Sequence, residues 1–213
     1  MRLLAAALLV AVLASGHCRA QPFAPWPKPA SVAVIGPEGD ARIALVHEAV
    51  AFWNATFAEL GVPFRIGPVE AVVGAIPVEE LTGLRDQFLE RRFPIPMPAA
   101  VENSAADIVI ALSDGDFVSF ALRWPQRGKA LAAIKSHHRW PLSLPNVARN
   151  VVAHELGHVL GLGHNDDPAK LMCGRPAPCR PDATQSNTPR IFPLTDGELA
   201  RLRDMYRRVS AAP

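Results

Sequence analysis

The chain has 213 residues, 49% of them hydrophobic and 20% charged, which is enough for one sizeable core or two small lobes. Its 22 basic residues against 20 acidic ones give a formal net charge of only +2. This balance gives no support to the binding of nucleic acid or of an acidic surface. We therefore expect no nucleic acid among its partners.

Residues 1–20 are typical of a secretory signal peptide. Arg2 is followed by an apolar run over residues 3–14 and then by several small residues. A membrane anchor is the alternative, but a spanning helix needs roughly 20 apolar residues. We expect cleavage after Ala20, with lipidation of Cys18 as the alternative. The mature protein would then be secreted, extracellular or periplasmic, with no membrane partner.

Loss of this segment would remove one of the three cysteines and leave Cys173 and Cys179. In an oxidising compartment two cysteines favour one disulfide, with two reduced thiols as the alternative. Such a bridge would close a small ring and shape a local loop rather than staple the whole fold.

The first half of the chain predicts strands and helices in alternation. In chain order the elements are an extended proline-rich segment over 21–30, a strand over 31–35, a helix from Asp40 to about Leu60, a strand over 63–73 and a helix over 79–92. Residues 75–105 contain four prolines and form an insertion of unassigned role. We consider this insertion the first candidate for a cover that keeps the protein latent.

The second half predicts a long helix late in the chain. Its elements are a buried strand over 106–112, a turn over 113–116, a strand over 129–135 at a sheet edge, a helix capped by Asn146, a loop over 165–193, and a last helix from the capping box of Thr195 and Glu198 to about Arg207. Early strands and a late helix predict an α+β fold divided by a cleft.

The helix that begins near Asn146 runs into the segment His-Glu-Leu-Gly-His-Val-Leu-Gly-Leu-Gly-His, residues 154–164. His154 and His158 are one helical turn apart, so both imidazoles project from the same face, with Glu155 beside them. Because the helix would rotate His164 away, a left-handed turn at the intervening glycine, Gly161, is needed to bring it back. Three neutral histidines with an open fourth position are what a catalytic zinc site requires. A helix with unrelated surface histidines is the alternative.

This pattern resembles the zinc signature of the metzincin peptidases. Met172, eight residues after His164, and the Asp-Pro at 167–168 are most similar to the matrixin, or matrix-metalloproteinase-like, branch. The resemblance implies one catalytic zinc ion on His154, His158 and His164, with Glu155 as the base. It also implies that Met172 lies in a tight turn below the metal, with Gly161 and Met172 supporting the site.

The resemblance also implies a fold and a domain plan. The fold is α+β and metzincin- or zincin-like, with a twisted mixed sheet and two helices in an N-terminal lobe over 31–163. After the active-site cleft comes a small C-terminal lobe over 164–213 with the Met turn and one helix. Residues 31–213 would then be the catalytic domain, after the signal over 1–20 and the proline-rich segment over 21–30.

Several residues depart from the matrixin pattern. Asn165 stands where matrixins usually have serine, and Met172 is followed by Cys173 and Gly174 in a rebuilt loop. The preference of the family for particular substrates therefore does not transfer. A His-Gly-Asp segment for structural zinc is missing, and residues 113–116 occupy its place. We favour a solvated turn there over a calcium site, which the sequence does not support.

The sequence thus predicts a secreted zinc-dependent endopeptidase that hydrolyses peptide bonds with a zinc-activated water and Glu155 as general base. We expect a monomer whose substrate is a protein or peptide that pairs with the edge strand. One alternative is a catalytically weak, zinc-containing module that only binds peptides. Another is a zinc amidase that acts on a cell-wall peptide. His137 and His138 could line the cleft, but exposed surface residues are the favoured interpretation.

Overall fold

A computed structural model describes residues 24–174, 177–186 and 188–210 of the chain. The predicted signal peptide over 1–20 lies outside these residues. Among the described helices, none has the length and apolar character that a membrane crossing needs.

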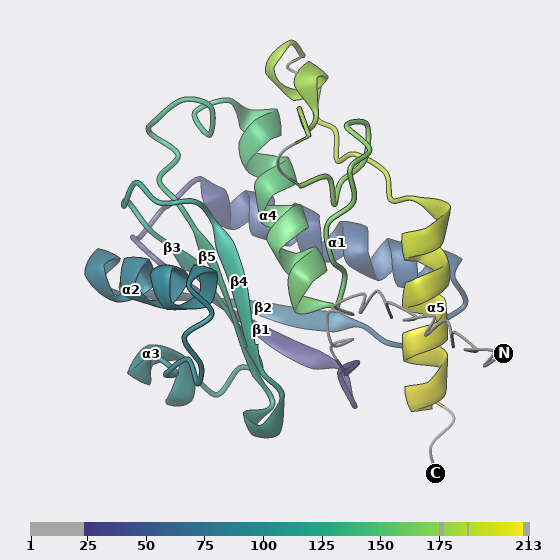
Figure 1. The fold of residues 1–213 in the computed structure, drawn as a ribbon, viewed down its shortest axis with the longest axis horizontal. Helices are drawn as coiled ribbons and strands as arrows, with labels where there is room; N and C mark the ends of the chain where they lie inside the picture. Colours follow the sequence, from purple (N-terminus) through teal and green to yellow (C-terminus); the bar gives the residue numbers. More distant parts are fainter. Residues whose placement is uncertain (1–23, 175–176, 187, 211–213) are drawn as a thin grey trace, which may run out of the picture.

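The described strands form one mixed sheet of five strands in the order β2-β1-β3-β5-β4 (Figure 1). Their bounds are Ala30–Gly36 for β1, Ile66–Val73 for β2, Ile108–Leu112 for β3, Phe120–Trp124 for β4 and Lys129–Ile134 for β5. The strands β2, β1, β3 and β5 are parallel to one another, and β4 pairs antiparallel with β5. Because β1, β3 and β5 are covered on both faces, their sequences are nearly continuous apolar runs.

The strand predictions over 31–35, 63–73 and 106–112 are confirmed by β1, β2 and β3. The strand over 129–135 also exists as β5, but its predicted place at the edge is wrong. β5 lies between β3 and β4, and β4 forms the edge. β4 was not predicted from the sequence; it is a short strand that connects to β5 through the 3₁₀ turn Pro125–Arg127 and a left-handed Gly128.

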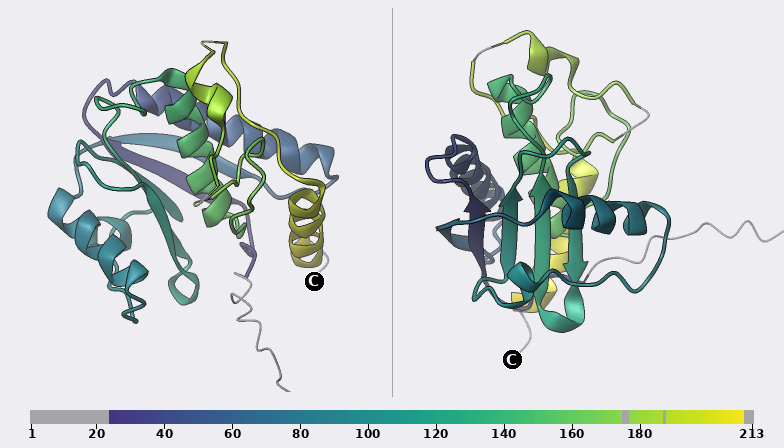
Figure 2. Two further views of the ribbon diagram at one scale, coloured as in Figure 1. Left: turned by 45° about the horizontal axis from the view of Figure 1, so that its top comes forward. Right: turned by 90° about the vertical axis from the view of Figure 1, so that its left-hand side faces the viewer.

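Helices cover both faces of this sheet. They are α1 Arg42–Glu59, α2 Val78–Leu89, α3 Ala99–Glu102, α4 Pro145–Val159 and α5 Asp196–Ser210. Alternate residues of β1 and β3 enter different cores: Val34 and Ile110 pack with residues of α1 and α4, whereas Ile35 and Val109 pack with residues of α2 and α3. Figure 2 shows the second pair of helices on the sheet face away from α4.

This arrangement corrects the expectation for residues 75–105. Leu81, Leu84 and Val101 from this insertion are buried against the sheet face that α4 does not occupy. The insertion therefore completes the second hydrophobic core, and its placement argues against a cover over the histidines.

The two helix starts predicted from capping residues have different outcomes. Thr195 Oγ1 accepts the backbone N–H of Glu198, and Glu198 Oε2 accepts the backbone N–H of Thr195, which confirms the capping box of α5. Asn146 does not cap α4, because Pro145 takes the first helical position and Leu144 precedes it. A proline costs nothing there, since its missing N–H would have no helical partner.

Three ring side chains fix α4 from different parts of the chain. The indole N–H groups of Trp26 and Trp53 donate to the carbonyls of Val159 and Ala153, each at 3.0 Å. The hydroxyl of Tyr206 on α5 donates to the carbonyl of Leu160 at 3.1 Å. Two of these carbonyls belong to the end of the helix, where they have no partner within it. The C-terminal end of α4 is therefore held by the segment before β1 and by α5, and its middle is held by α1.

Candidate metal centre

The end of α4 directs the chain back toward its own histidines. Gly161 has φ of 100°, and its N–H bonds to the carbonyl of His158 while that of Leu162 bonds to the carbonyl of Gly157. This pair of hydrogen bonds around a left-handed residue is the Schellman motif, in which glycine is favoured. The left-handed turn expected at Gly161 is therefore present. It brings His164, from the following loop, close to the helix.

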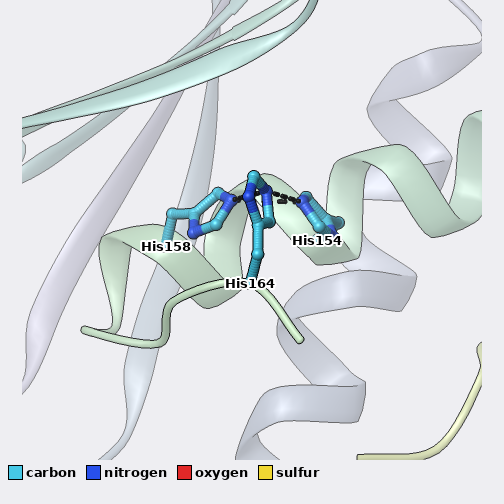
Figure 3. A group of neighbouring side chains, drawn as sticks. All are labelled: His154, His158 and His164. Atoms are coloured by element: carbon cyan, nitrogen blue, oxygen red, sulfur yellow. Dashed lines mark hydrogen bonds between the residues drawn. The ribbon is translucent and has the colours of Figure 1, made fainter. Parts of the chain in front are cut away.

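The three histidines converge on one point (Figure 3). The Nε2 atoms lie 3.1 Å apart for His154 and His158, 3.2 Å for His154 and His164, and 3.0 Å for His158 and His164. Zn–N bonds of about 2.0–2.1 Å in a tetrahedron place ligand nitrogens about 3.3 Å apart. The observed spacing fits a shared zinc ion. The residues form a three-histidine zinc-binding group, as the sequence predicted.

Hydrogen bonds on the other ring nitrogens orient two of these imidazoles. Nδ1 of His154 donates to the carbonyl of Leu171 at 2.8 Å, and Nδ1 of His158 donates to the carbonyl of Leu162 at 2.9 Å. A proton on Nδ1 leaves the lone pair of Nε2 free to face a metal ion. The carbonyls therefore select the tautomer that binds zinc.

Burial keeps the rings in the neutral form that metal binding needs. It lowers the pKa of His154 well below the ordinary value, and it lowers the pKa of His158 to about 4. It also lowers the pKa of His164, although this residue is exposed. The group is thus anchored in the core at His154 and faces solvent at His164.

Glu155, which follows His154 in α4, is buried. Its side chain is 6% exposed, and its Oε2 atom is buried without a hydrogen-bond partner among the described residues. Burial raises the pKa of Glu155 to about 8, and the positive charge of Arg180 acts in the opposite direction. A cation bound to the histidines would further favour the charged carboxylate.

Two glycines allow side chains to approach the site closely. A Cβ atom added to Gly157 would lie 2.4 Å from Sδ of Met172, so Met172 packs against the helix between His154 and His158. A Cβ atom added to Gly174 would lie 2.3 Å from Cγ of His164. Met172 is fully buried here, next to the histidine helix rather than at the surface.

A family comparison agrees with this geometry. The model of the Matrixin family, Peptidase_M10, matches residues 123–185, which include the three histidines, Glu155 and Met172. These findings support a metzincin-like zinc peptidase. The matched segment is less than a third of the chain, so the matrixin branch itself remains an expectation. No curated protein matches the sequence.

Several solved structures are similar to this metzincin-like chain at low identity. An archaemetzincin from Methanopyrus kandleri is 14% identical over 86% of this chain and 97% of its own, with a TM-score of 0.46. Metalloproteinase-II from Bacteroides fragilis is 18% identical over 86% of this chain and 55% of its own, with a TM-score of 0.43. A zinc-dependent peptidase from Methanocorpusculum labreanum is 19% identical over 80% and 99%, with a TM-score of 0.38.

The predicted disulfide is present and lies directly after Met172. Cys173 and Cys179 are bonded, with their Cα atoms 5.5 Å apart. The bridge closes a small ring, as expected, and Arg180 follows it. Arg180 was not predicted from the sequence to have a role at the site, yet its Nη1 atom donates to the carbonyl of Leu171. That carbonyl also receives the Nδ1–H of His154.

The turn over residues 113–116 does not favour a calcium ion. Asp116 pairs with Lys135 and Arg139, and Asp114 lies 3.6 Å from the guanidinium of Arg42. The hydrogen bond from Lys135 lowers the pKa of Asp116. Protein cations therefore already pair with both carboxylates. The segment is only partly solvated, because Ser113 and Gly115 are buried while Asp114 and Asp116 are exposed.

His137 and His138 stack on each other with ring centres 4.1 Å apart, and neither belongs to the three-histidine group. His138 is exposed, and its Nε2 atom lies 3.9 Å from Asp114. His138 therefore agrees with the favoured interpretation of an exposed residue. His137 does not, because it is half-buried and its Nδ1 atom is buried without a hydrogen-bond partner among the described residues.

Proposed function

We propose that this protein is a secreted zinc-dependent endopeptidase in which Glu155 is the general base. The observation that carries the proposal is a buried carboxylate with an unpartnered oxygen, adjacent in the helix to a histidine of the zinc-binding group. When bound by His154, His158 and His164, zinc supplies a Lewis acid that polarises the scissile carbonyl and acidifies a water molecule. An apolar environment strengthens every charge interaction in such a site.

In this mechanism Glu155 moves the proton. Its carboxylate accepts a proton from the attacking water and then delivers it to the departing amine, so that one group serves as base and acid. The unpartnered Oε2 atom supports this role, since no described residue competes for it. The backbone carbonyls of Leu171 and Leu162 meanwhile keep the two helical imidazoles in place.

The substrate would bind along β4 rather than β5. Among the described strands β4 pairs with β5 alone, which leaves its other edge without a strand partner. β4 also packs against α4, the helix that carries His154 and His158. An extended peptide can add itself to a free strand edge through main-chain hydrogen bonds. A protein or peptide at this edge would therefore run beside the zinc-binding helix.

Met172 and Gly161 are proposed to support the ligands without touching substrate. Met172 fills the space that Gly157 leaves on α4, and Gly161 provides the turn before His164. The Met172–Gly157 contact and the Gly161 turn both lie next to the histidines of the zinc-binding group. Secretion is proposed from the signal-like residues 1–20, and the disulfide agrees with an oxidising compartment.

The test compares wild type with Glu155→Gln on quenched fluorescent peptides and on casein. We expect Glu155→Gln to keep one zinc ion per chain and to lose turnover by about 10²–10⁴-fold, the range for a lost general base. Glu48→Gln is the matched control. Glu48 lies on α1 and pairs with Arg149, which is on α4 like Glu155 but outside the histidine segment.

Wild-type turnover in Glu155→Gln would refute the assigned role. Peptide binding by wild type without cleavage would instead indicate a binding module. Cleavage of cell-wall peptides but not of casein would indicate an amidase.

A further inference from the structure

We infer that Arg180 is a positioning residue for the zinc ligand His154 and acts through the backbone carbonyl of Leu171. This inference rests on the proposed zinc function of the three histidines. Leu171 O accepts two hydrogen bonds, one of 2.8 Å from Nδ1 of His154 and one of 2.5 Å from Nη1 of Arg180. The guanidinium and the imidazole are therefore joined by one oxygen atom.

Arg180 holds more of this turn than one carbonyl. Its Nη1 atom also lies 3.3 Å from the carbonyl oxygens of Lys170 and Cys173. These carbonyls surround Met172, which packs against Gly157 on the zinc-binding helix. The guanidinium of Arg180 thus contacts three backbone carbonyls of the turn that packs beside α4.

The backbone at Arg180 is fixed in an uncommon conformation. Its φ of 51° and ψ of 53° lie in the left-handed region, which residues with a side chain seldom adopt. Such conformations persist where the surroundings over-determine them, often at functional sites. Here the disulfide holds the preceding Cys179 to Cys173, and the N–H of Arg180 donates to the carbonyl of Pro168 at 2.8 Å. The side chain is thereby aimed at Leu171.

The charge of Arg180 is directed to carbonyls rather than to an ion pair. Within the described part of the chain, no carboxylate oxygen lies within 4.0 Å of its guanidinium. Hydrogen bonds with a charged donor are shorter and stronger than neutral ones. The partner of a zinc-binding histidine sets the orientation of its ring and typically contributes 10–100-fold to metal affinity. By fixing Leu171 O, Arg180 would fix the ring of His154.

The experiment measures zinc affinity of the metal-free protein by competition with a coloured chelator. It also records the absorption spectrum with cobalt in place of zinc, which reports the geometry of the ligands. We expect Arg180→Met to bind zinc about 10–100-fold more weakly, with a changed cobalt spectrum. Arg180→Lys keeps a charged donor but not the planar fork, so an intermediate loss is expected.

Arg149→Met is the matched control. Arg149 is a buried arginine on α4, whereas Arg180 is half-buried, and Arg149 contacts Glu48 and Asn146 instead of the turn at Leu171. If Arg180 only braces the loop, both methionine variants will be less stable, and neither will change zinc affinity or the cobalt spectrum. That result would overturn the inference.

If Arg180→Met does not fold, Arg180→Lys provides the test. Zinc affinity and a cobalt spectrum equal to those of wild type in Arg180→Lys would contradict the inference. A wild-type protein that binds no zinc would refute the proposed function itself.

Discussion

Individual glycines determine how closely the chain can pack around the histidines. The sequence predicted His154, His158 and His164 together, because helical spacing and one left-handed glycine are enough to bring them to one point. It did not predict the roles of Gly157 and Gly174. Their importance depends on Met172 and His164 lying against them, and no spacing rule places those contacts. Arg180 was missed for the same reason, since the disulfide and the turn decide where its side chain points.

At this scale we predict that Gly174→Ala disturbs the third ligand. The new Cβ would lie 2.3 Å from Cγ and 2.6 Å from Nδ1 of His164, closer than real Cβ contacts allow. His164 must move, so zinc affinity should fall by at least about tenfold. Stability should fall by about 1–3 kcal/mol, as in other overpacked sites. Chelator competition measures the first effect, and urea denaturation measures the second.

Gly163→Ala is the control, because a Cβ at Gly163 meets nothing within 4 Å although it neighbours His164 in the chain. Equal zinc affinity in the two variants would show that contact with Gly174 does not hold the ring.

At the scale of elements, the predictions succeeded where local signals were strong. The apolar runs of β1 and β3 and the capping box of α5 were each identified from the sequence. Two errors have physical causes. β4 is short and carries Arg123, so it lacks the continuous apolar pattern of the central strands. Asparagine often caps helices, but the side-chain amide of Asn146 instead donates to the carbonyls of Ser186 and Thr188.

The capping box provides the prediction for this scale. Thr195→Ala removes the hydroxyl that accepts the N–H of Glu198 at 3.1 Å, so the first turn of α5 loses a partner. We expect the free energy of unfolding to fall by about 1 kcal/mol, the usual value for a lost N-cap. Chemical denaturation measures this change, and Thr195→Ser, which keeps the hydroxyl, should remain close to wild type. A loss of equal size in both variants would mean that the methyl group, rather than the hydrogen bond, stabilises the helix.

At the scale of the whole molecule, α4 is held by contacts that the sequence alone could not reveal. Trp26, Trp53 and Tyr206 donate to its backbone from sequence separations of 133, 100 and 46 residues. Leu202 and Tyr206 of the predicted C-terminal lobe share one core with Trp53 of the N-terminal lobe. The division into lobes over 31–163 and 164–213 stays a prediction. The α+β class and the mixed sheet, by contrast, are confirmed.

The zinc content of the purified protein tests the central claim most directly. Atomic emission spectrometry should find one zinc ion per chain in wild type and in His138→Ala, whose imidazole lies outside the three-histidine group. His158→Ala should retain almost none, because one of three nitrogens within 3.2 Å of one another is lost. A full zinc ion in His158→Ala, or none in wild type, would contradict the account.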